Sequence, residues 1–207
     1  VPICFNVIGL GWAGPLILDK GTEYEREKYL KGILNAEDIW CQGFSEPNHG
    51  SDLGSIQTRA ERDGSDYIIN GSKIWTTMGN YAKYMILLAR TEAQAERKYN
   101  GLSFFLAPMS AEGISTQPIQ KLTGEYGFTE TFFTDARIPA DCIMGEEGQG
   151  WRIAMQTLQY ERGAEAGAAG GISILSIVMN DLLKMAAKVE REGQPLLKDH
   201  VTRDNLV

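Results

Sequence analysis

The sequence predicts an α+β fold, in which a central antiparallel β-barrel or sandwich is flanked by helical segments. Three observations lead to this prediction. Apolar residues recur at helical spacing before residue 40, they cluster in short runs between turn signals from 41 to about 144, and helical spacing returns after residue 150. Short strands separated by tight turns are typical of sandwiches and barrels. We therefore divide the chain into 1–40 (helical), 41–147 (β) and 148–207 (helical).

The first region contains a helix-start signal. Thr22 and Glu25 have the spacing of a capping box, and apolar residues follow at helical intervals at Tyr29, Leu30 and Ile33. We expect a helix to begin at Thr22.

The second region contains two dipeptides that are typical of tight hairpins, Asp63-Gly64 and Asn70-Gly71. Further apolar runs at 84–88, 102–106 and 131–133 predict additional strands.

The third region opens with a glycine-rich bend at 145–150. Its G-x-x-G-x-G order differs from the G-x-G-x-x-G dinucleotide fingerprint, so it predicts a turn that starts a helix. Apolar residues then recur at helical spacing through Met155 and Leu158, and again from Leu175 to Leu182.

Composition excludes several classes of function. The 207 residues include 20 Lys and Arg against 27 Asp and Glu, for a net charge of −7. An acidic chain does not favour nucleic acid or an anionic membrane. No stretch is apolar enough to span a bilayer. Three scattered cysteines (Cys4, Cys41 and Cys142) and two distant histidines predict neither disulfides nor a metal site. We expect a cytoplasmic protein of bacterial type, or one of the mitochondrial matrix.

Two segments carry groups that suit a flat cofactor. A strand end runs into a polar loop that reads Gln42-Gly43-Phe44-Ser45-Glu46-Pro47-Asn48-His49-Gly50-Ser51-Asp52. Free N–H groups and hydroxyls in such a loop can bind the polar edge of a ring or a phosphate, although a solvated turn is the commoner role. The second segment is Asn70-Gly71-Ser72-Lys73-Ile74-Trp75-Thr76-Thr77. An indole can cover an isoalloxazine face while a neighbouring hydroxyl bonds its edge, although a Trp on a strand is more often core.

These segments resemble two signatures of the acyl-CoA dehydrogenase family, S/T-E-P-x-x-G-S-D and N-G-x-K-x-W-x-T. Two more segments are similar to the family in the same order, at 132–139 and 145–151, so that the resemblance runs from about 21 to about 171. It implies an acyl-CoA dehydrogenase-like fold, with the end of an N-terminal helical domain, a middle β-domain and the start of a C-terminal helical bundle.

The resemblance also implies the site. FAD would contact Gln42, Phe44, Ser45, Trp75, Thr76 and Thr77, and the acyl-CoA substrate would contact Ser51 and Arg162. The family often has Tyr where this chain has Gln42.

The family removes an α-proton from an acyl thioester while the β-hydrogen leaves as hydride to flavin N5. In isovaleryl-type and long-chain-type members the base is a glutamate directly before an arginine, and Glu161 holds that position before Arg162. Glu161 is therefore our candidate base. The alternatives are a helix carboxylate that only pairs with Arg162, and a base located beyond Val207.

The predicted activity is FAD-dependent dehydrogenation of an acyl-CoA of undetermined chain length, and this chain alone is expected to be inactive. The expected partners are electron-transferring flavoprotein or a similar acceptor, and further subunits in a homodimer or homotetramer. Two alternatives remain: an oxygen-using relative (an acyl-CoA oxidase or flavin monooxygenase), and a non-catalytic acyl-CoA-binding or scaffold member.

Overall fold

A computed structural model describes residues 6–167, 169–191 and 193–205, with the side chains of 164–174 excepted. Cys4 lies outside these ranges. The chain divides into two compact units, Val1–Glu161 and Arg162–Val207.

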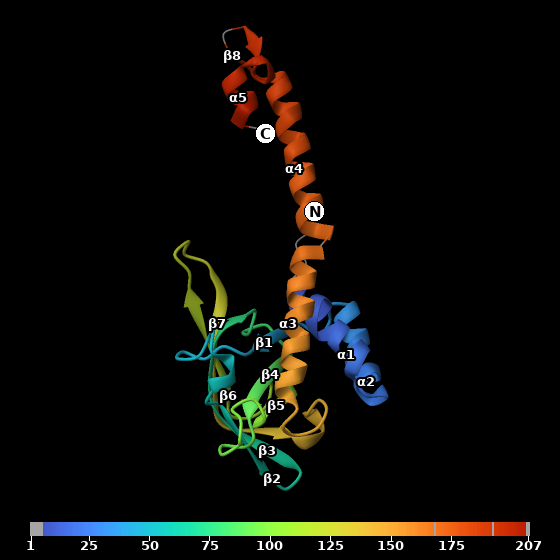
Figure 1. Cartoon of the computed structure of the whole chain (residues 1–207), viewed down its shortest axis with the longest axis vertical. Coiled ribbons are helices and arrows are strands. Elements are labelled where there is room, and N and C mark those ends of the chain that lie inside the picture. The colour runs from blue at the N-terminus through green and yellow to red at the C-terminus, as the bar shows by residue number, and fades with distance from the viewer. Residues whose placement is uncertain (1–5, 168, 192, 206–207) are drawn as a thin grey trace. The chain divides into compact units, whose positions relative to one another are not determined.

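The first unit opens with helices, which lie beside the sheet (blue in Figure 1). A π-helical turn at Gly9–Ala13 leads into α1 (Gly14–Lys20), and α2 (Glu23–Leu34) follows. The predicted capping box of α2 is confirmed. The Thr22 hydroxyl accepts a hydrogen bond from the Glu25 N–H at 3.2 Å, and the Glu25 carboxylate accepts one from the Thr22 N–H at 2.6 Å.

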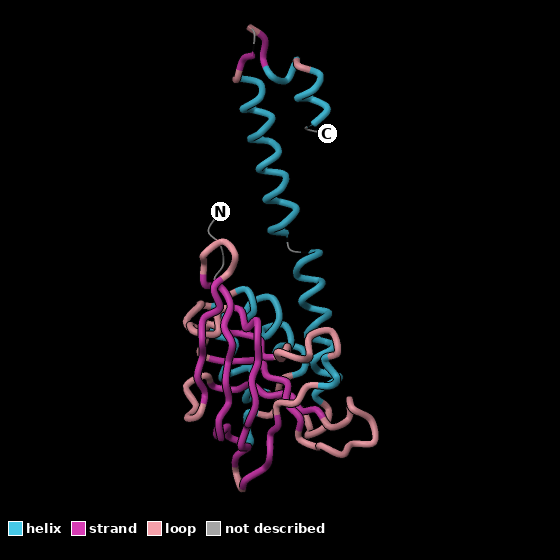
Figure 2. Tube along the Cα trace, turned by 90° about the vertical axis from the view of Figure 1, so that its left-hand side faces the viewer, coloured by secondary structure: helices cyan, strands magenta, loops and turns pink. Residues whose placement is uncertain are grey.

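Seven strands form one curved sheet, seen side by side in Figure 2. The spatial order is β1-β4-β2-β3-β7-β6, and β5 pairs with β4. The strands are β1 (Trp40–Gly43), β2 (Arg59–Asp63), β3 (Asp66–Thr77), β4 (Tyr84–Arg90), β5 (Leu102–Pro108), β6 (Ile114–Gln120) and β7 (Tyr126–Pro139). Short 3₁₀ turns lie at Leu53–Ser55 and Ala140–Cys142.

The predicted α+β class is confirmed, but the sheet is mixed rather than purely antiparallel. Strand β1 runs parallel to β4 over four residue pairs, and β2 meets β4 in parallel at Arg59 and Arg90. The reason is the connection: no tight turn joins β1 to β4, and the intervening chain, which includes the β2–β3 hairpin, returns in the original direction.

One of the two predicted hairpins is wrong. The Asp63-Gly64 signal does mark the turn between β2 and β3, and Gly64 has the positive φ of 62° that such turns need. At Asn70-Gly71, however, β3 continues. The neighbouring strand β7 carries an extra residue there, and the Asn70 side chain accepts a hydrogen bond from the Asp135 N–H at 2.9 Å. The dipeptide faces a β-bulge instead of forming a turn.

The sheet buries both of its faces around β4. Ile86 and Leu88 belong to a core that the sheet shares with α1, α2 and the helix that begins at Gly150. Met85 and Leu87 belong to a second core, which is built largely from side chains of the strands. All four side chains are fully buried. This accounts for the unbroken apolar run, because a strand that is buried on both faces has no polar alternation.

Helix α3 (Gly150–Gly167) begins at the glycine-rich bend, as predicted. Its first turns pack Ile153 and Ala154 into the core of the first unit.

The second unit contains α4 (Ala169–Lys188), a two-residue hairpin of β8 (Glu190–Arg191) with β9 (Gln194–Pro195), a 3₁₀ turn at Leu196–Lys198, and α5 (His200–Asn205). In the described part of the chain no helix combines the length and the apolar character that crossing a bilayer requires.

Candidate active site

Predicted site residues from distant parts of the sequence converge on one cavity of about 150 Å³ in the first unit. The cavity draws on the N-terminal helical turns, on β1 and its following loop, on the end of β3 and on α3. Its lining residues are Ile8, Trp12, Gln42, Phe44, Ser45, Ile74, Trp75, Thr77 and Glu161. Five of the predicted flavin contacts and the predicted base therefore share a single site.

A β-bulge directs Trp75 into this cavity. Lys73 pairs with Thr131 of β7, but the next recorded pair is Thr76 with Thr129, so β3 has one extra residue between them. Side chains alternate along a strand, and without the extra residue Trp75 would share the buried face of Lys73. Trp75 instead has a left-handed φ of 59° and leaves 57% of its surface exposed. A bulky residue at positive φ is strained, and such strain concentrates at functional sites.

One side of the Trp75 ring packs against an aromatic neighbour. It meets the edge of Phe128, with ring centroids 6.0 Å apart and planes at 89°. Its remaining surface is available to a second flat ring.

Gln42 and Glu161 meet across the cavity. Gln42 Nε2 donates a hydrogen bond to Glu161 Oε2 at 3.4 Å, although 119 positions separate the two residues. Gln42 Oε1 is buried and has no hydrogen-bond partner among the residues that the structure describes. A buried acceptor without a donor is costly, so this atom favours a ligand that supplies an N–H or O–H group.

These groups fit a flavin. An isoalloxazine presents carbonyl acceptors and an N–H donor at its edge, which match the hydroxyls of Ser45 and Thr77 and the free Oε1 of Gln42. Trp75 can cover a ring face. The cavity is smaller than a typical ligand pocket of roughly 300–1,000 Å³. The described residues therefore form one wall of such a site.

Three predicted site residues do not line the cavity. The Thr76 side chain is fully buried on the opposite face of β3, where Thr131 Oγ1 donates to Thr76 Oγ1 at 3.5 Å. Ser51 is exposed on the loop after β1, and Arg162 is exposed at the start of the second unit.

Sequence reasoning missed two residues that line the cavity and two that adjoin its lining residues. Ile8 and Trp12 line it from the first helical turns, and no local signal marks them. Glu46 and Lys73, which adjoin the lining residues Ser45 and Ile74 in the sequence, form an ion pair of 2.9 Å with side chains 5% and 0% exposed. A signal for this pair existed, because Lys73 is the only charged residue of 70–77, and Glu46 is the only Asp, Glu, Lys or Arg of 42–51.

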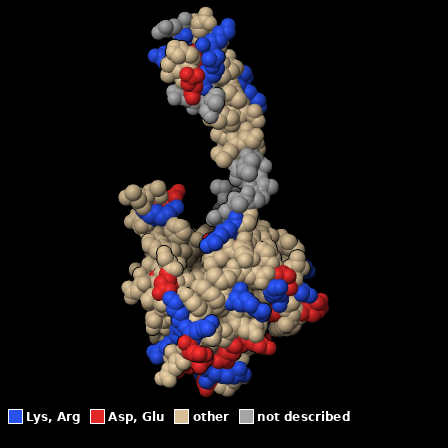
Figure 3. Space-filling model, in the orientation of Figure 1, with Lys and Arg blue, Asp and Glu red and all other residues tan. Residues whose placement is uncertain are grey.

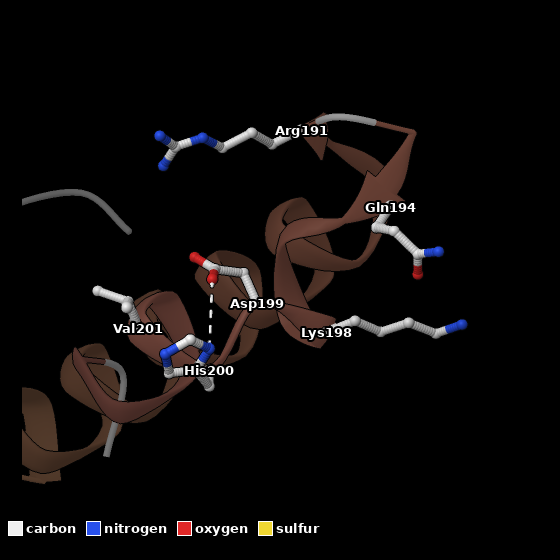
Figure 4. Close-up of a pocket in the computed structure, with 6 residues that line it drawn as sticks. All are labelled: Arg191, Gln194, Lys198, Asp199, His200 and Val201. Carbon is white, nitrogen blue, oxygen red and sulfur yellow. Dashed lines mark ion pairs between the residues drawn. The ribbon is translucent and has the colours of Figure 1, made fainter.

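A wider pocket of about 580 Å³ lies in the second unit (Figure 4). It is lined by Arg191, Gln194, Lys198, Asp199, His200 and Val201, and contains no predicted site residue. Figure 4 shows Arg191 and Lys198 extending away from each other, and the His200–Asp199 pair is long at 4.0 Å. These side chains do not converge on a ligand, and we assign the pocket no role.

Charge and metal-ligand patterns add no second site. Figure 3 shows both signs of charge intermingled on the visible face of the first unit, without a basic patch. Across the residues that the structure describes, no three His, Cys, Asp or Glu side chains are grouped to hold a metal ion. Cys41 and Cys142 are buried and unpaired.

Comparison with known proteins identifies the family. Residues 41–136 match the profile "Acyl-CoA dehydrogenase, middle domain". The chain is 38% identical over 198 residues to acyl-CoA dehydrogenase IpdE1 of Mycobacterium tuberculosis. The aligned region covers 96% of this chain and 51% of that protein. The chain thus spans about half the length of the curated relatives it matches.

Solved structures agree. The "Tcur3481-Tcur3483 steroid ACAD" superposes with a TM-score of 0.83 at 34% identity, over 97% of this chain and 50% of that one. The "Prolyl Acyl Carrier Protein Oxidase AnaB" has a TM-score of 0.83 at 28% identity, over 93% of this chain and 50% of that one. With motifs, fold and relatives in agreement, this chain belongs to the acyl-CoA dehydrogenase family, and its sheet is the family's middle domain.

Proposed function

We propose that the protein catalyses FAD-dependent α,β-dehydrogenation of an acyl-CoA thioester, with Glu161 as the base that removes the α-proton. The convergence of Glu161, Ser45, Trp75 and Thr77 on one cavity is the observation that carries the proposal. FAD, when bound, supplies the acceptor for the two electrons and the β-hydrogen. The residues of this chain hold the ring and place the carboxylate.

The position of Glu161 suits a base. It lies on α3 at the cavity, half-buried, and Gln42 Nε2 directs one carboxylate oxygen. A carboxylate that is held within reach of the α-carbon contributes through orientation as well as basicity. Gln42 replaces the Tyr that is common in the family. Its amide can donate to the ionised carboxylate, and its free Oε1 can accept from the carboxylic acid once the proton has been taken.

The roles of the remaining predicted residues follow from their placement. Any flavin contact of Thr76 comes from its main chain, because its hydroxyl faces β7. Ser51 and Arg162 are exposed and available to the nucleotide end of CoA. The acceptor in this proposal is electron-transferring flavoprotein or an equivalent, and a homodimer or homotetramer completes the site.

The test compares Glu161→Gln with wild type in the complete gene product, loaded with FAD. The substrates are straight-chain, branched, cyclic and steroid-derived acyl-CoA thioesters. We expect kcat to fall by on the order of 100-fold or more, with FAD binding retained. The matched control, Glu27→Gln, alters an exposed carboxylate on α2 and should leave kcat unchanged. Near-normal turnover by Glu161→Gln would contradict the assignment.

The oxygen-using alternative is favoured by one observation, the similarity to the oxidase AnaB. The two activities differ in the fate of the reduced flavin. Reoxidation by air within the turnover time would show an oxidase, whereas slow reoxidation and fast transfer to an external acceptor would show a dehydrogenase. Retention of Glu161, Trp75 and Thr77 in one cavity argues against a non-catalytic scaffold.

A further inference from the structure

Glu46 and Lys73 are the immediate sequence neighbours of Ser45 and Ile74, which line the candidate flavin site. Both belong to the family signatures, and neither is among the residues that line the cavity. Their ion pair of 2.9 Å is buried, with Lys73 fully enclosed and Glu46 5% exposed. A buried ion pair is weak support for stability, because desolvation of the two charges opposes their attraction. Its presence next to two lining residues of the site, Ser45 and Ile74, calls for another reason.

The pair joins the loop after β1 to strand β3. Lys73 Nζ donates to Glu46 Oε1 at 2.9 Å and to the Phe44 carbonyl at 3.1 Å. The other carboxylate bonds hold the two residues just before β2: Glu46 accepts from the Gln57 N–H at 2.6 Å and from the Thr58 N–H at 2.8 Å. Three segments are therefore tied to one carboxylate and one ammonium group.

This arrangement sets the register of the two cavity walls. Between Phe44 and Glu46, Ser45 presents its side chain to the cavity while its carbonyl accepts from the Ile74 N–H at 2.9 Å. On the other wall Lys73 is the last residue in register before the bulge that exposes Trp75. Movement of Lys73 relative to Glu46 would displace Ser45 and Trp75 with respect to each other.

The pair is kept at a cost. Burial lowers the pKa of Lys73 to about 8 despite the attraction of Glu46. Burial alone would raise the pKa of Glu46, but the charge of Lys73 and the hydrogen bonds from Thr58 and Gln57 lower it. Apolar residues of similar volume would avoid the desolvation of both groups, but they would make no directional bonds to the Phe44 carbonyl or to the amides of Gln57 and Thr58.

We propose that Glu46 and Lys73 are a positioning pair. Their ion pair and hydrogen bonds join the Ser45 loop to strand β3, and so set the distance between the Ser45 hydroxyl and the Trp75 indole, the two groups that would contact the flavin. The inference rests on the proposed function for the identity of the ligand. Neither residue touches the flavin or the substrate; each acts through the backbone of its neighbours.

The experiment uses the complete gene product and the neutral double variant Glu46→Gln/Lys73→Met. Removing both charges avoids an unpaired buried ion, so the fold should survive. The single variant Glu46→Gln is the second test protein, because the lowered pKa of Lys73 allows its neutral form. The matched control is Glu125→Gln/Lys121→Met, which removes an exposed ion pair of 2.7 Å in the β6–β7 turn.

The measurements are the melting temperature, the Kd for FAD, the visible circular dichroism of bound flavin, and kcat at saturating FAD. We expect the double variant to melt close to wild type, to bind FAD at least about tenfold more weakly with an altered visible spectrum, and to lose on the order of 100-fold in kcat. The control should match wild type in all four.

A folded double variant with wild-type FAD affinity and spectrum would overturn the proposal. Unfolding of both test proteins would also overturn it, because it would assign the pair to the fold itself. Failure of the proposed function is distinguishable, since wild type would then bind FAD without oxidising any acyl-CoA thioester, or would not bind FAD.

Discussion

The two units of the chain differ in how completely they bury their apolar side chains. In Val1–Glu161 the side chains of the sheet and of the helices beside it form two enclosed cores, and Phe104 and Phe105 are fully buried. In Arg162–Val207 large apolar side chains of α4 remain exposed, among them Leu175 at 70% and Met185 at 56%. Helix α4 is more apolar in sequence than α2 and α3, so a polar sequence does not explain its exposure.

The comparison teaches that amphipathic spacing specifies a helix but not what covers it. Helix α3 packs Ile153 and Ala154 against the sheet through its first turns, whereas α4 has an apolar face without comparable burial among the described residues. A sheet that curves around its own side chains completes a core locally. A single long helix with a short hairpin and a six-residue helix does not.

The largest effect that would sharpen this comparison concerns the enclosed core. Phe104→Ala removes a fully buried ring that packs edge-on against Phe44 at 6.0 Å, and should cost about 3–5 kcal/mol of unfolding free energy. Leu175→Ala, on the exposed face of α4, should change stability by only about 0.5 kcal/mol. Urea denaturation of both variants measures the contrast. Equal losses would show that α4 is as tightly packed as the sheet.

A second contrast concerns ion pairs. Lys73→Met leaves Glu46 charged in a buried site, and should cost about 3–5 kcal/mol. Lys184→Met breaks an exposed pair with Asp181 on α4, where both side chains are more than half exposed, and should cost about 0–1 kcal/mol. Denaturant midpoints at pH 7 compare them. A loss below about 1 kcal/mol for Lys73→Met would contradict the enclosed geometry.

The smallest effect is a pH dependence that only the enclosed lysine produces. Burial lowers the pKa of Lys73 from 10.5 to about 8 against the opposing attraction of Glu46. Between these values the unfolded chain binds more protons, so the unfolding free energy rises with pH, by at most about 1.4 kcal/mol per unit. This contribution is fully present above pH 10.5, and is lost as the pH falls through about 8.

The check is the unfolding free energy of wild type minus that of Lys73→Met. Urea denaturation measures both values at several pH values from 7.5 to 10.5. Other groups that titrate in this range are common to both proteins and cancel in the difference. The difference should grow with pH. A decrease would mean that the pKa of Lys73 is raised.

Local signals predicted much of the fold because their physics is local. The Thr22 and Glu25 capping box, the Asp63-Gly64 turn and the glycine-rich start of α3 each depend on a few consecutive residues. The Asn70-Gly71 signal failed because β7 offered a bulge and a side-chain partner, which no local pattern reports.

Part of the lining of the candidate site was predictable from the sequence, but its geometry was not. Family signatures pointed to Ser45, Trp75, Thr77 and Glu161, which share the cavity. Strand alternation would have placed Trp75 on the buried face, and the bulge that reverses this arises from the pairing of β3 with β7.

The sequence by itself determined the order of helical and β segments, the Thr22 cap, the Asp63-Gly64 turn, and which residue types could meet a flavin, because these depend on composition and on the spacing of nearby residues. Only the tertiary structure decided that Glu46 and Lys73 are a buried pair, that Gln42 reaches Glu161, and that Thr76 faces away from the cavity. Those outcomes depend on contacts between residues up to 119 positions apart, which a local pattern cannot specify.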